Sequence, residues 1–473
     1  MSALWTAEEA ARATGAVLAA GADWSADGVS IDTRAIRRRD LFVALKGPRF
    51  DGHDFVAGAL SDGAAAAMVD RPLPAVDPAR LLAVKDTQEG LEALAAAARA
   101  RSEARIAAVT GSVGKTGTKE ALAKVLGEQG ATHASVGNLN NHIGTPLSLA
   151  RMPAASRFAV FELGMNHAGE IAPLSRMVRP HAAIITTVEA VHLEYFTGIE
   201  GIADAKAEIF DGMNADGAAI LNRDNPLFDR LSRHARARGL GRVWSFGDRG
   251  EEARLVSASL TAEGSAVEAL ILGRKIDFRL PLPGRHHVQN ALAVLLAAVA
   301  LEADLDAAAR SLATLSPVKG RGTVHEVAIP GGVFRLIDES YNASPAAVRA
   351  ALGVLGMMPA LSGGRRILVL GDMLELGPEG PAAHADLAEA ALDARVGLVF
   401  TAGPLSRHLH DALPASARGA HAADATMLAP MVASAIGPND LVLVKGSAGS
   451  RMGAVVQALR DLGSPDREAR HAV

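Results

Sequence analysis

The stretch AAVTGSVGKTGTKE, residues 107–120, decides how this chain folds. A short apolar run typical of a strand enters a glycine-rich turn, and Lys115 and Thr116 then open a helical pattern. Such a turn directs backbone N–H groups and a helix N-terminus at an anion, which makes it a phosphate cradle. The lysine would neutralise charge between the β- and γ-phosphates, and the threonine hydroxyl would ligate Mg²⁺. The stretch therefore predicts a nucleotide site.

The turn is shorter than the pattern G-x-x-x-x-G-K-[ST]. Val109 stands where the first glycine is expected, and Gly111 lies only three residues before Gly114. A plain glycine turn between a strand and a helix is the structural alternative. The strand before the turn and the helix after it favour nucleotide binding. The candidate contacts are Gly111, Ser112, Val113, Gly114, Lys115, Thr116 and Gly117.

The segment around this turn alternates strands with helices. A helical pattern follows each of four strand-like runs, RIAAVTG, RFAVFELG, HAAIITTV and GAAILNRD, which predicts a mostly parallel sheet covered by helices. Between Arg254 and Leu282 the strands alternate with turn-like breaks, which predicts an antiparallel addition. A long helix is expected from about Val288.

Two further α/β parts flank this segment. Short strands and alanine-rich helices precede residue 105, and a linker containing Pro and Gly, SLATLSPVKGRG, leads into the last third. There, a second doubly wound, Rossmann-like sheet is predicted from the runs FRLIDES, RRILVLGD, GLVFTAG and DLVLVKGS. The expected fold class is α/β in three domains, spanning residues 1–105, 106–316 and 317–473.

Composition narrows the class of protein. The 473 residues carry 48 basic and 52 acidic side chains, for a net charge of −4, and no basic run marks a nucleic-acid surface. The absence of cysteine excludes disulfides and thiolate chemistry. The N-terminus has no secretory pattern, and the longest apolar run, Ala291–Leu301, is too short for a bilayer. We expect a cytoplasmic protein with no membrane or nucleic-acid partner.

One lysine interrupts an apolar pattern in GIADAKAEIF, residues 201–210. Read as a helix, the segment places Ile202, Ile209, Phe210 and Met213 on one face, and Lys206 lies in the middle of that stripe. A side chain that snorkels from the edge of the stripe to water is the ordinary explanation.

Several motifs, in chain order, resemble the Mur ligase superfamily, whose members activate a carboxylate with ATP and capture it with an amine. The shortened loop T-G-x-x-G-K-T is one point of resemblance. The others are IDTRAIRRRDLFVALKGPRFDGHDF (31–55), GNLNNHIGTPLSL (137–149), ELGMNHAGEI (162–171), HLEYFTGIEGIADAKAEIF (192–210), LPGRHHVQNALAV (282–294), DESYNASP (338–345), LGDMLELG (370–377) and LVKGS (443–447). The resemblance covers all three expected domains.

Three of these motifs are most similar to the members that add D-alanyl-D-alanine to UDP-N-acetylmuramoyl-tripeptide: GNLNN-x-IG-x-P, DESYNASP and LGDMLELG. The resemblance implies an ATP-dependent amide ligase of peptidoglycan precursor synthesis that works through an acyl phosphate. It implies a UDP-sugar-binding first domain, an ATP-binding central domain and a C-terminal ligase domain. A monomer is expected, with these two small molecules as partners and ATP, two Mg²⁺ ions and CO₂ as cofactors.

The resemblance also gives catalytic roles to Lys115, Glu162, His192 and Lys206. Glu162 ends one predicted strand and His192 follows another, so both are expected at the carboxyl edge of the central sheet. In the superfamily, the matching residues hold a second Mg²⁺ together with a carbamylated lysine, which Lys206 matches. A buried amine is neutral, and its reaction with CO₂ gives an oxygen ligand suited to Mg²⁺. For His192, a core imidazole bonded to the backbone is the alternative.

Other matched residues would contact the nucleotide from the later domains. Asn290 matches an adenine-contacting asparagine at a helix start, and a helix cap is its alternative. His287 stands where the family often has asparagine. Asp338 matches a ribose-binding acid. Arg321 matches an arginine that contacts nucleotide on closure, and an interdomain salt bridge would explain it equally well.

Residues matched to substrate binding fall in three places. In the first domain, Asp32, Thr33 and Arg34 match the uridine-diphosphate element D-S-R. Amides that suit sugar and peptide carbonyls come next, and an ordinary polar loop is their alternative: Asn138, Asn140 and Asn141. The C-terminal candidates are Tyr341, Asn342, Lys445 and Ser447, and a strand-end turn is the alternative for the last two.

Two rival functions are open. A ligase of the same superfamily that adds a diamino acid to UDP-MurNAc-dipeptide carries D-N-P-R in its last domain. Here DNP occurs at Asp224–Pro226 in the central domain and is followed by Leu227. A P-loop regulatory NTPase, from a different class, would use the glycine loop alone and would leave Glu162, His192 and Lys206 without a role.

Overall fold

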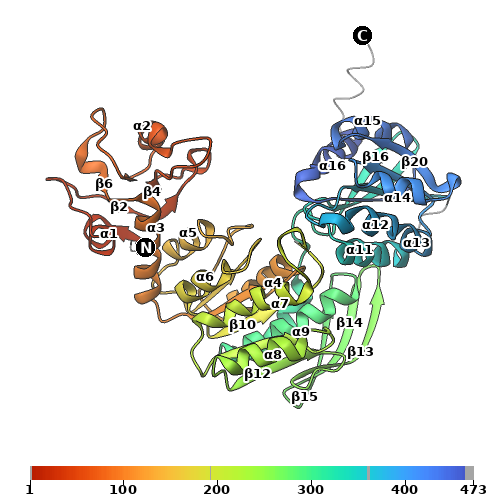
Figure 1. Cartoon of the computed structure of the whole chain (residues 1–473), viewed down its shortest axis with the longest axis horizontal. Helices are drawn as coiled ribbons and strands as arrows, with labels where there is room; N and C mark the ends of the chain where they lie inside the picture. The colour runs from red at the N-terminus through yellow and green to blue at the C-terminus, as the bar shows by residue number, and fades with distance from the viewer. Residues whose placement is uncertain (1–2, 192, 360–362, 464–473) are drawn as a thin grey trace, which may run out of the picture.

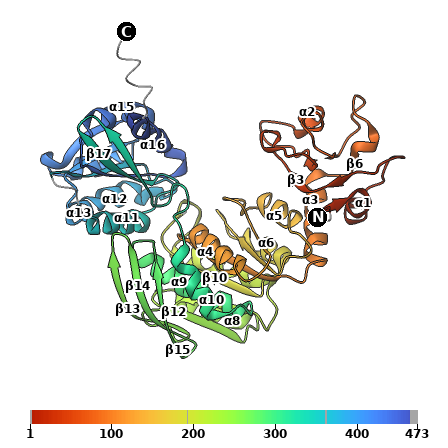
Figure 2. The same ribbon diagram turned by 180° about the vertical axis from the view of Figure 1, so that it is seen from behind.

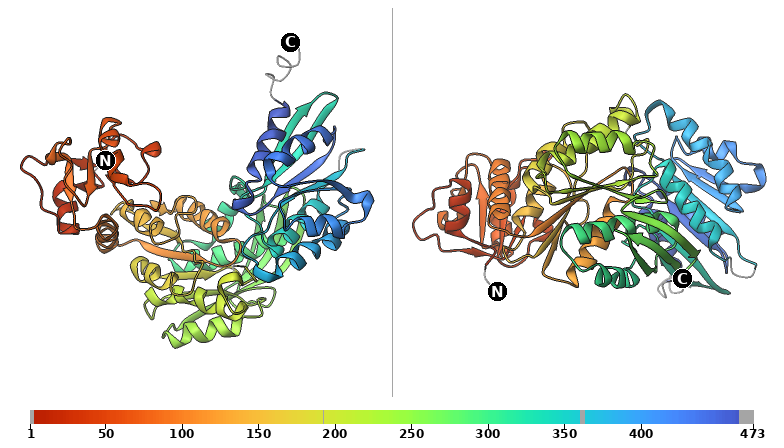
Figure 3. Two further views of the ribbon diagram at one scale, coloured as in Figure 1. Left: turned by 45° about the horizontal axis from the view of Figure 1, so that its top comes forward. Right: turned by 90° about the horizontal axis from the view of Figure 1, so that it is seen from below.

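The computed structural model describes residues 3–191, 193–359 and 363–463. Its ribbon forms three lobes in chain order, with the first and third lobes at opposite ends of the molecule (Figure 1). The same order is visible from behind (Figure 2) and from below (Figure 3). Each lobe has a sheet of its own, so the expected α/β class in three parts is confirmed.

The first lobe carries a parallel sheet in the order β3-β4-β5-β6. Its strands and helices are β1 (Trp5–Thr6), β2 (Ser25–Ala26), β3 (Gly28–Ser30), β4 (Asp40–Val43), β5 (Ala66–Val69), β6 (Leu81–Ala83), α1 (Ala7–Thr14), α2 (Val56–Ser61) and α3 (Thr87–Ala100). The Trp5 indole N–H donates over 2.9 Å to the carbonyl of Ala150 in the central lobe. This contact ties the first two lobes together.

The central lobe is built on a nine-stranded sheet in the order β15-β14-β13-β12-β11-β10-β7-β9-β8. The strands are β7 (Arg105–Thr110), β8 (Thr132–Ala134), β9 (Phe158–Glu162), β10 (Ala182–Ile185), β11 (Ala218–Asn222), β12 (Arg242–Gly247), β13 (Ala253–Thr261), β14 (Gly264–Ile271) and β15 (Arg274–Leu280). The helices are α4 (Lys115–Gly127), α5 (Gly144–Ala150), α6 (Ile171–Val178), α7 (Ile199–Ala207), α8 (Phe228–Ala237), α9 (Arg285–Ala300) and α10 (Leu305–Ser311).

Helices cover both faces of this sheet. Along β7, Ala107 and Val109 face a core shared with α4 and α9, whereas Ile106 and Ala108 face a core shared with α6, α7 and α8. This two-residue alternation is the pattern of a strand buried on both faces. Figure 2 shows α4 and α9 side by side on one of them. The four expected parallel strands and the antiparallel addition, β13 to β15, are confirmed.

The long helix of this lobe begins earlier than expected. Helix α9 starts at Arg285 rather than near Val288, because Gly284, at φ 112°, supplies a sharp turn before it. Within the described residues, no helix combines the length and the apolar character that crossing a membrane requires.

The C-terminal lobe carries a six-stranded sheet in the order β16-β17-β21-β18-β19-β20. Its elements are β16 (Thr323–Ile329), β17 (Gly332–Glu339), β18 (Arg366–Gly371), β19 (Leu398–Ala402), β20 (Arg418–Ala422), β21 (Leu441–Lys445), α11 (Pro345–Met357), α12 (Gly380–Ala385), α13 (Leu387–Asp393), α14 (Arg407–Ala412), α15 (Ala425–Ala435) and α16 (Gly453–Arg460). The four predicted strands form β17, β18, β19 and β21, and the two edge strands were not anticipated.

A buried histidine joins two strands of the central sheet and gives a first testable prediction. The Ile106 N–H donates over 2.9 Å to Nδ1 of His181, and burial, reinforced by Arg105 and Arg99, lowers the pKa of His181 to about 4. The unfolded chain therefore binds more protons than the fold, and stability falls as the pH drops from about 6.5 towards 4. We expect His181→Asn, which retains an acceptor for Ile106, to remove about one proton from that dependence.

Urea unfolding midpoints compared at about pH 7.5 and pH 5 measure this effect. The exposed His142→Asn variant is the matched control. An equal loss of stability between the two pH values in His181→Asn and the parent chain would contradict the assignment.

Candidate functional site

The glycine turn after β7 packs closely against two neighbours. Gly111 has φ 146°, and a Cβ there would overlap the Thr186 hydroxyl. Gly114 has φ 84°, and a Cβ there would lie 2.9 Å from Nδ2 of Asn290. Helix α4 begins directly at Lys115 without a side-chain cap. Its first N–H groups are therefore free to bind an anion.

The loop after β10 holds this turn in place. The Ser112 N–H donates to the Thr187 carbonyl over 2.8 Å, and the Thr186 hydroxyl donates to the Val113 carbonyl over 2.6 Å. The Ser112 hydroxyl also donates to the Glu189 carbonyl over 3.1 Å. Burial raises the pKa of the Glu189 side chain. Hydrogen bonds between the turn after β7 and the loop after β10 thus hold the anion cradle in its shape.

The lysine of the turn folds back over it. Lys115 Nζ donates to the Gly111 carbonyl over 2.8 Å and to the Ser112 carbonyl over 3.3 Å. Burial lowers the pKa of Lys115; Glu162 opposes this shift and Arg321 adds to it. The ammonium therefore already stands inside the loop, where phosphate oxygens would replace the two carbonyls as its partners.

Glu162 connects the nucleotide turn to the amide-rich loop. One carboxylate oxygen accepts from the Thr116 hydroxyl over 2.7 Å, and the other accepts from Nδ2 of Asn140 over 2.7 Å. Glu162 is 2% exposed and Thr116 is 5% exposed. The structure thus brings together three of the residues predicted from the sequence.

Lys206 is buried, and the interpretation of a snorkelling side chain is wrong. The residue is 2% exposed, and three hydrophobic neighbours in the sequence, Ile202, Ile209 and Phe210, belong to a core shared with α6. Helix α7 ends at Ala207 and continues as a 3-10 turn. Burial, reinforced by the charge of Lys115, lowers the pKa of Lys206 well below its usual value. His192, the third predicted metal ligand, lies outside the described residues.

The donors around the turn suit a magnesium ion. The Thr116 hydroxyl and the Glu162 carboxylate are hard oxygen donors placed together at the start of α4. Among the described residues, no group of three or more His, Asp or Glu side chains forms a metal cage. Mg²⁺ commonly uses one or two protein oxygens and completes its shell with water and phosphate oxygens, so this donor set fits it.

A cavity of about 930 Å³ opens between the central and C-terminal lobes. The sequence-predicted residues that line it are Ser112, Val113, Gly114, Lys115, Thr116, Gly117, Asn290, Arg321, Asn342, Lys445 and Ser447. Its apolar part is contributed by side chains of α11 and of the segment before α9, among them Leu282, Pro283, Ala350 and Val354. Such a mixture of apolar wall and convergent polar groups is typical of a small-molecule site.

Asn290 lies within α9 and not at its start, so the helix-cap interpretation is wrong. The N-cap position is Gly284, six residues before Asn290, so Asn290 already lies in the second turn of the helix. His286 and His287 lie in that first turn with ring centroids 4.1 Å apart, and both line the cavity. Burial lowers the pKa of both imidazoles, which favours their neutral forms.

Arg321 stacks on a tyrosine of the C-terminal lobe. Its guanidinium carbon lies 4.2 Å from the ring centroid of Tyr341, and no acidic partner lies within salt-bridge distance of Arg321 among the described residues. The alternative of an interdomain salt bridge is therefore not what this structure contains. Tyr341 itself is 36% exposed and supports Arg321 from the side.

Lys445 forms a buried ion pair at the end of β21. Its Nζ donates to Glu339 Oε2 over 2.8 Å and to the Asn342 carbonyl over 3.0 Å. Ser447 donates through its hydroxyl to the Ala343 carbonyl over 3.3 Å. These contacts bring the motifs DESYNASP and LVKGS together where the adjacent strands β17 and β21 end.

Asp338 takes a different place from the one expected. It is 6% exposed, and its carboxylate accepts from the Ser340 N–H over 3.0 Å and from the Ser340 hydroxyl over 2.6 Å. The next residue, Glu339, lines the cavity instead. Glu339, Glu189 and His286 were not singled out from the sequence, and the alternation of side chains along a strand is the signal that could have raised Glu339.

The first-lobe candidates form a compact exposed unit. Asp32 caps a short 3-10 turn by accepting from the Arg34 N–H over 3.0 Å, and its carboxylate pairs with the Arg34 guanidinium over 2.7 Å. That hydrogen bond to Arg34 lowers the pKa of Asp32. Thr33 is half-buried between them.

The three asparagines of the GNLNN loop divide between two roles. The Asn141 side chain accepts from the Gly144 N–H over 2.9 Å and so caps α5. Asn140 bonds to Glu162, as described above, and Asn138 is exposed. The Asn141 cap uses only its carbonyl oxygen and the Asn140 bond only its amide nitrogen, so each of the three asparagines keeps a side-chain group that a ligand can contact.

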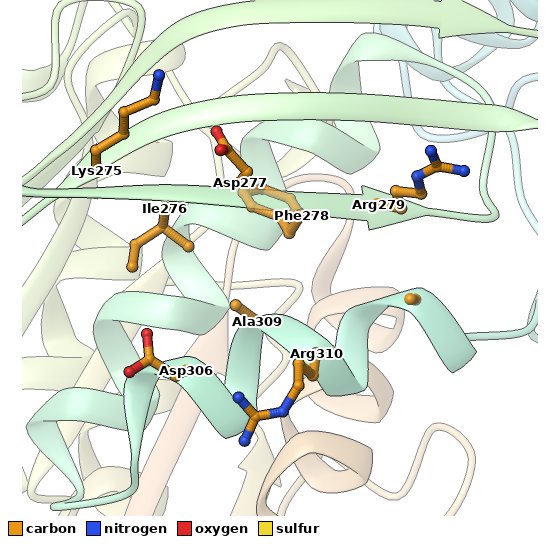
Figure 4. Close-up of a pocket in the computed structure, with 9 residues that line it drawn as sticks. Lys275, Ile276, Asp277, Phe278, Arg279, Asp306, Ala309 and Arg310 are labelled. Carbon is orange, nitrogen blue, oxygen red and sulfur yellow. The ribbon is translucent and has the colours of Figure 1, made fainter.

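A second, smaller cavity lies away from these residues. It has a volume of about 450 Å³ and is bounded by β15 and α10 (Figure 4). Figure 4 shows Ile276 and Phe278 directed towards the helix and Lys275 directed away from it. Arg274 pairs with Asp306 over 3.0 Å beside it. None of the residues that line this cavity belongs to the nucleotide turn.

Each of the three lobes matches a domain of a known protein family. Residues 25–102 match the Mur ligase family catalytic domain, residues 109–298 the Mur ligase middle domain and residues 320–448 the Mur ligase glutamate ligase domain. UDP-N-acetylmuramoyl-tripeptide--D-alanyl-D-alanine ligase of Escherichia coli (strain K12) is 40% identical to it over 448 residues, which cover 94% of this chain and 96% of that protein.

Solved structures are similar over almost the whole length. Crystal structure I of MurF from Acinetobacter baumannii has a TM-score of 0.83 at 30% identity and covers 97% of this chain and 99% of its own. MurF ligase from Thermotoga maritima, in complex with ADP, has a TM-score of 0.77 at 27% identity and covers 94% and 98%. Three α/β lobes around a phosphate-cradling turn define an ATP-dependent ligase. The chain belongs to the Mur ligase family.

Proposed function

We propose that this ligase adds D-alanyl-D-alanine to UDP-N-acetylmuramoyl-tripeptide, with ATP converted to ADP and phosphate. The names of the relative from E. coli and of the similar MurF structures support this substrate pair. One structural observation carries the proposal. The nucleotide turn and the C-terminal residues Asn342, Lys445 and Ser447 line a single cavity, where a phosphoryl group and an amine could meet.

The roles proposed for the lobes follow the chain. Residues 1–105 would bind the UDP-sugar through Asp32, Thr33 and Arg34, and residues 106–316 would bind ATP. Residues 317–473 would bring the dipeptide through Tyr341, Asn342, Lys445 and Ser447. Arg321 and Asn290 are proposed as further nucleotide contacts, and Asn138, Asn140 and Asn141 as contacts of the muramoyl-peptide.

Amide formation from a carboxylate needs activation. In the first step, an oxygen of the peptide carboxylate bonds to the γ-phosphorus while the bond from that phosphorus to the β–γ bridging oxygen breaks, and ADP leaves. In the second step, the dipeptide amine attacks the acyl carbon, the carbon–oxygen bond to phosphate breaks, and the amine proton passes to solvent. Lys115 and the N–H groups of α4 stabilise the charge that moves onto the phosphoryl oxygens.

Metal binding is proposed for the same site. Thr116 would hold one Mg²⁺, and Glu162, His192 and Lys206 would hold a second. When bound, Mg²⁺ would neutralise phosphate oxygens and thereby favour attack of the carboxylate oxygen on the γ-phosphorus. Lys206 would serve as a carbamate: its neutral Nζ bonds to the carbon of CO₂, and the displaced proton passes to solvent. The burial of Lys206 and the lowering of its pKa support this proposal.

The cellular setting is part of the proposal. The reaction would occur in the cytoplasm as a step of peptidoglycan precursor synthesis, on which cell-wall biogenesis, cell shape and cell division depend. The chain would act as a monomer.

The rival functions are not favoured. Asp224, in the DNP sequence of the central lobe, accepts from the Asp248 N–H over 2.7 Å and from the Arg249 N–H over 3.1 Å. It therefore organises a turn next to β12 and does not present a substrate contact in the last lobe. A regulatory NTPase would not need the C-terminal groups that line the cavity.

The test is phosphate release measured with ATP and each substrate separately and together. We expect release only when UDP-N-acetylmuramoyl-tripeptide and D-alanyl-D-alanine are both present. Release with UDP-N-acetylmuramoyl-dipeptide and a diamino acid would point to the rival ligase. Turnover that is independent of both acceptor substrates would point to a regulatory NTPase.

A further inference from the structure

Strand β8, at the edge of the central sheet, ends before its main chain can supply an acceptor for the Glu162 N–H. Strand β8 pairs with β9 through Thr132–Ala134, and the Ser135 N–H still donates to the Val160 carbonyl over 3.0 Å. The chain then leaves the sheet, so no further carbonyl of β8 reaches the N–H of Glu162. Instead, that N–H donates to the Ser135 hydroxyl over 3.1 Å. The Ser135 hydroxyl thus replaces the main-chain carbonyl that would accept the last hydrogen bond between β8 and β9.

A buried lysine fixes the serine in turn. Lys119 is fully buried on α4, and its Nζ donates to the Ser135 carbonyl over 2.6 Å and to Glu120 Oε1 over 2.5 Å. A buried ammonium is costly to the fold unless its N–H groups are bonded. Ser135 is consequently held from both sides, by the helix through its carbonyl and by β9 through its hydroxyl.

These contacts lead to the proposed metal ligands. Lys119 and Thr116 lie three residues apart on α4, so they share one side of that helix. Lys119 reaches the main chain of Glu162 by way of Ser135, whereas Thr116 reaches the Glu162 carboxylate directly. Ser135 is 2% exposed, so water does not compete for these bonds. The backbone and the side chain of Glu162 are therefore both fixed to the same helix.

We propose that Ser135 and Lys119 are positioning residues that hold the Glu162 carboxylate ready for the divalent cation proposed there, beside the one proposed at Thr116. The inference rests on the proposed function, in which Thr116 and Glu162 bind Mg²⁺. Groups that orient a ligand carboxylate influence its affinity for metal, because a misdirected oxygen cannot reach the distance and angle that coordination requires. Ser135 should therefore influence how much Mg²⁺ strengthens nucleotide binding, without changing nucleotide binding in the absence of Mg²⁺.

The test compares Ser135→Val with Ser135→Thr, because the two side chains have the same shape and only threonine has a hydroxyl. Binding of a nonhydrolysable ATP analogue to the full chain is measured by calorimetry, once with Mg²⁺ and once with EDTA. We expect Ser135→Val to reduce the gain in affinity produced by Mg²⁺ by about tenfold relative to Ser135→Thr. The affinities in EDTA should agree within about twofold, since the phosphate cradle is unchanged.

Ser245 provides the matched control, because its buried hydroxyl also accepts a backbone N–H, from Glu251 over 2.8 Å, elsewhere in the sheet. Ser245→Val should leave the Mg²⁺ effect unchanged. Ser135→Val combined with Glu162→Gln should show no greater loss than Glu162→Gln alone, because the serine acts through the glutamate. A purely structural role of Ser135 would add a second loss.

An equal Mg²⁺ effect in Ser135→Val and Ser135→Thr, with a reduced effect in Glu162→Gln, would overturn this inference and leave the proposed metal site standing. An undiminished Mg²⁺ effect in Glu162→Gln would instead overturn the metal site. If the valine side chain prevents folding, Ser135→Ala, which adds no atoms, is compared with the parent chain by the same two titrations. An unchanged Mg²⁺ effect there would equally overturn the role of Ser135.

Discussion

Lys115→Met is expected to lower kcat/KM for ligation by about 10³-fold. The substitution keeps the length and the apolar stem of the side chain but removes the ammonium that stands inside the nucleotide turn. In the resting structure this ammonium donates to the Gly111 and Ser112 carbonyls, at 2.8 and 3.3 Å, so it is already oriented towards the cradle. The charge that develops on the transferred phosphoryl group would lose its nearest positive partner.

ADP formation with both acceptor substrates present measures this effect. Lys275→Met removes an exposed lysine that pairs with Glu268 over 2.9 Å far from the turn, and it should retain full activity. If Lys115→Met ligates at a rate close to that of the Lys275→Met control, the turn does not serve phosphoryl transfer.

Lys206→Ala is expected to reduce ligation by about 10²-fold or more, because a metal-binding oxygen would be lost with the carbamate. Because Lys206 is only 2% exposed, the truncation leaves a small buried space in place of its side chain. A short carboxylic acid such as formate can enter such a space and supply the missing carboxylate oxygens. Partial recovery of activity with increasing formate is therefore the expected result.

Lys115→Met should show no recovery under the same conditions, since its loss is a cation and not an oxygen donor. Labelled bicarbonate followed by ¹³C NMR gives a direct view of the carbamate carbon in the parent chain. Parent-like activity of Lys206→Ala, or a recovery by formate that also occurs in Lys115→Met, would contradict the carbamate.

The strands that could be predicted from the sequence are those buried on both faces. Strands β7, β9, β10 and β11 are continuous apolar runs with a helical pattern after each, and all four formed where expected. Strands β8, β16 and β20 lie at sheet edges, where one side has no neighbouring strand and the sequence is less apolar. In β20, for example, the segment RGAHA contains little that marks a strand. Its pairing with β19 decides its conformation, and pairing is not a local property.

In the candidate site, too, some features could be predicted from the sequence and others depend on how distant segments pack. The glycine turn and Thr116 could be predicted from local spacing, whereas for Lys206 the spacing alone favoured a snorkelling side chain and only the family resemblance indicated its burial. The bond between Asn140 and Glu162 joins residues on different segments, and only the packing of the loop after β8 against β9 creates it. Asp338 and Glu339 are adjacent on β17, and which of them faces the cavity depends on the register of that strand with β21.

The segment joining the central and C-terminal lobes packs against the central core through Leu315 at its start and is hydrogen-bonded to the C-terminal lobe at its end. The Tyr341 N–H donates to the Gly320 carbonyl over 3.2 Å, the Gly322 N–H donates to the Asp338 carbonyl over 2.9 Å, and Arg321 stacks on Tyr341. Residues 320–322 are therefore attached to the C-terminal lobe, and a rotation of that lobe would bend the chain between Leu315 and Gly320. Because Arg321 and Lys445 line the same cavity as the glycine turn, such a rotation would change the distance of both cations from the triphosphate together.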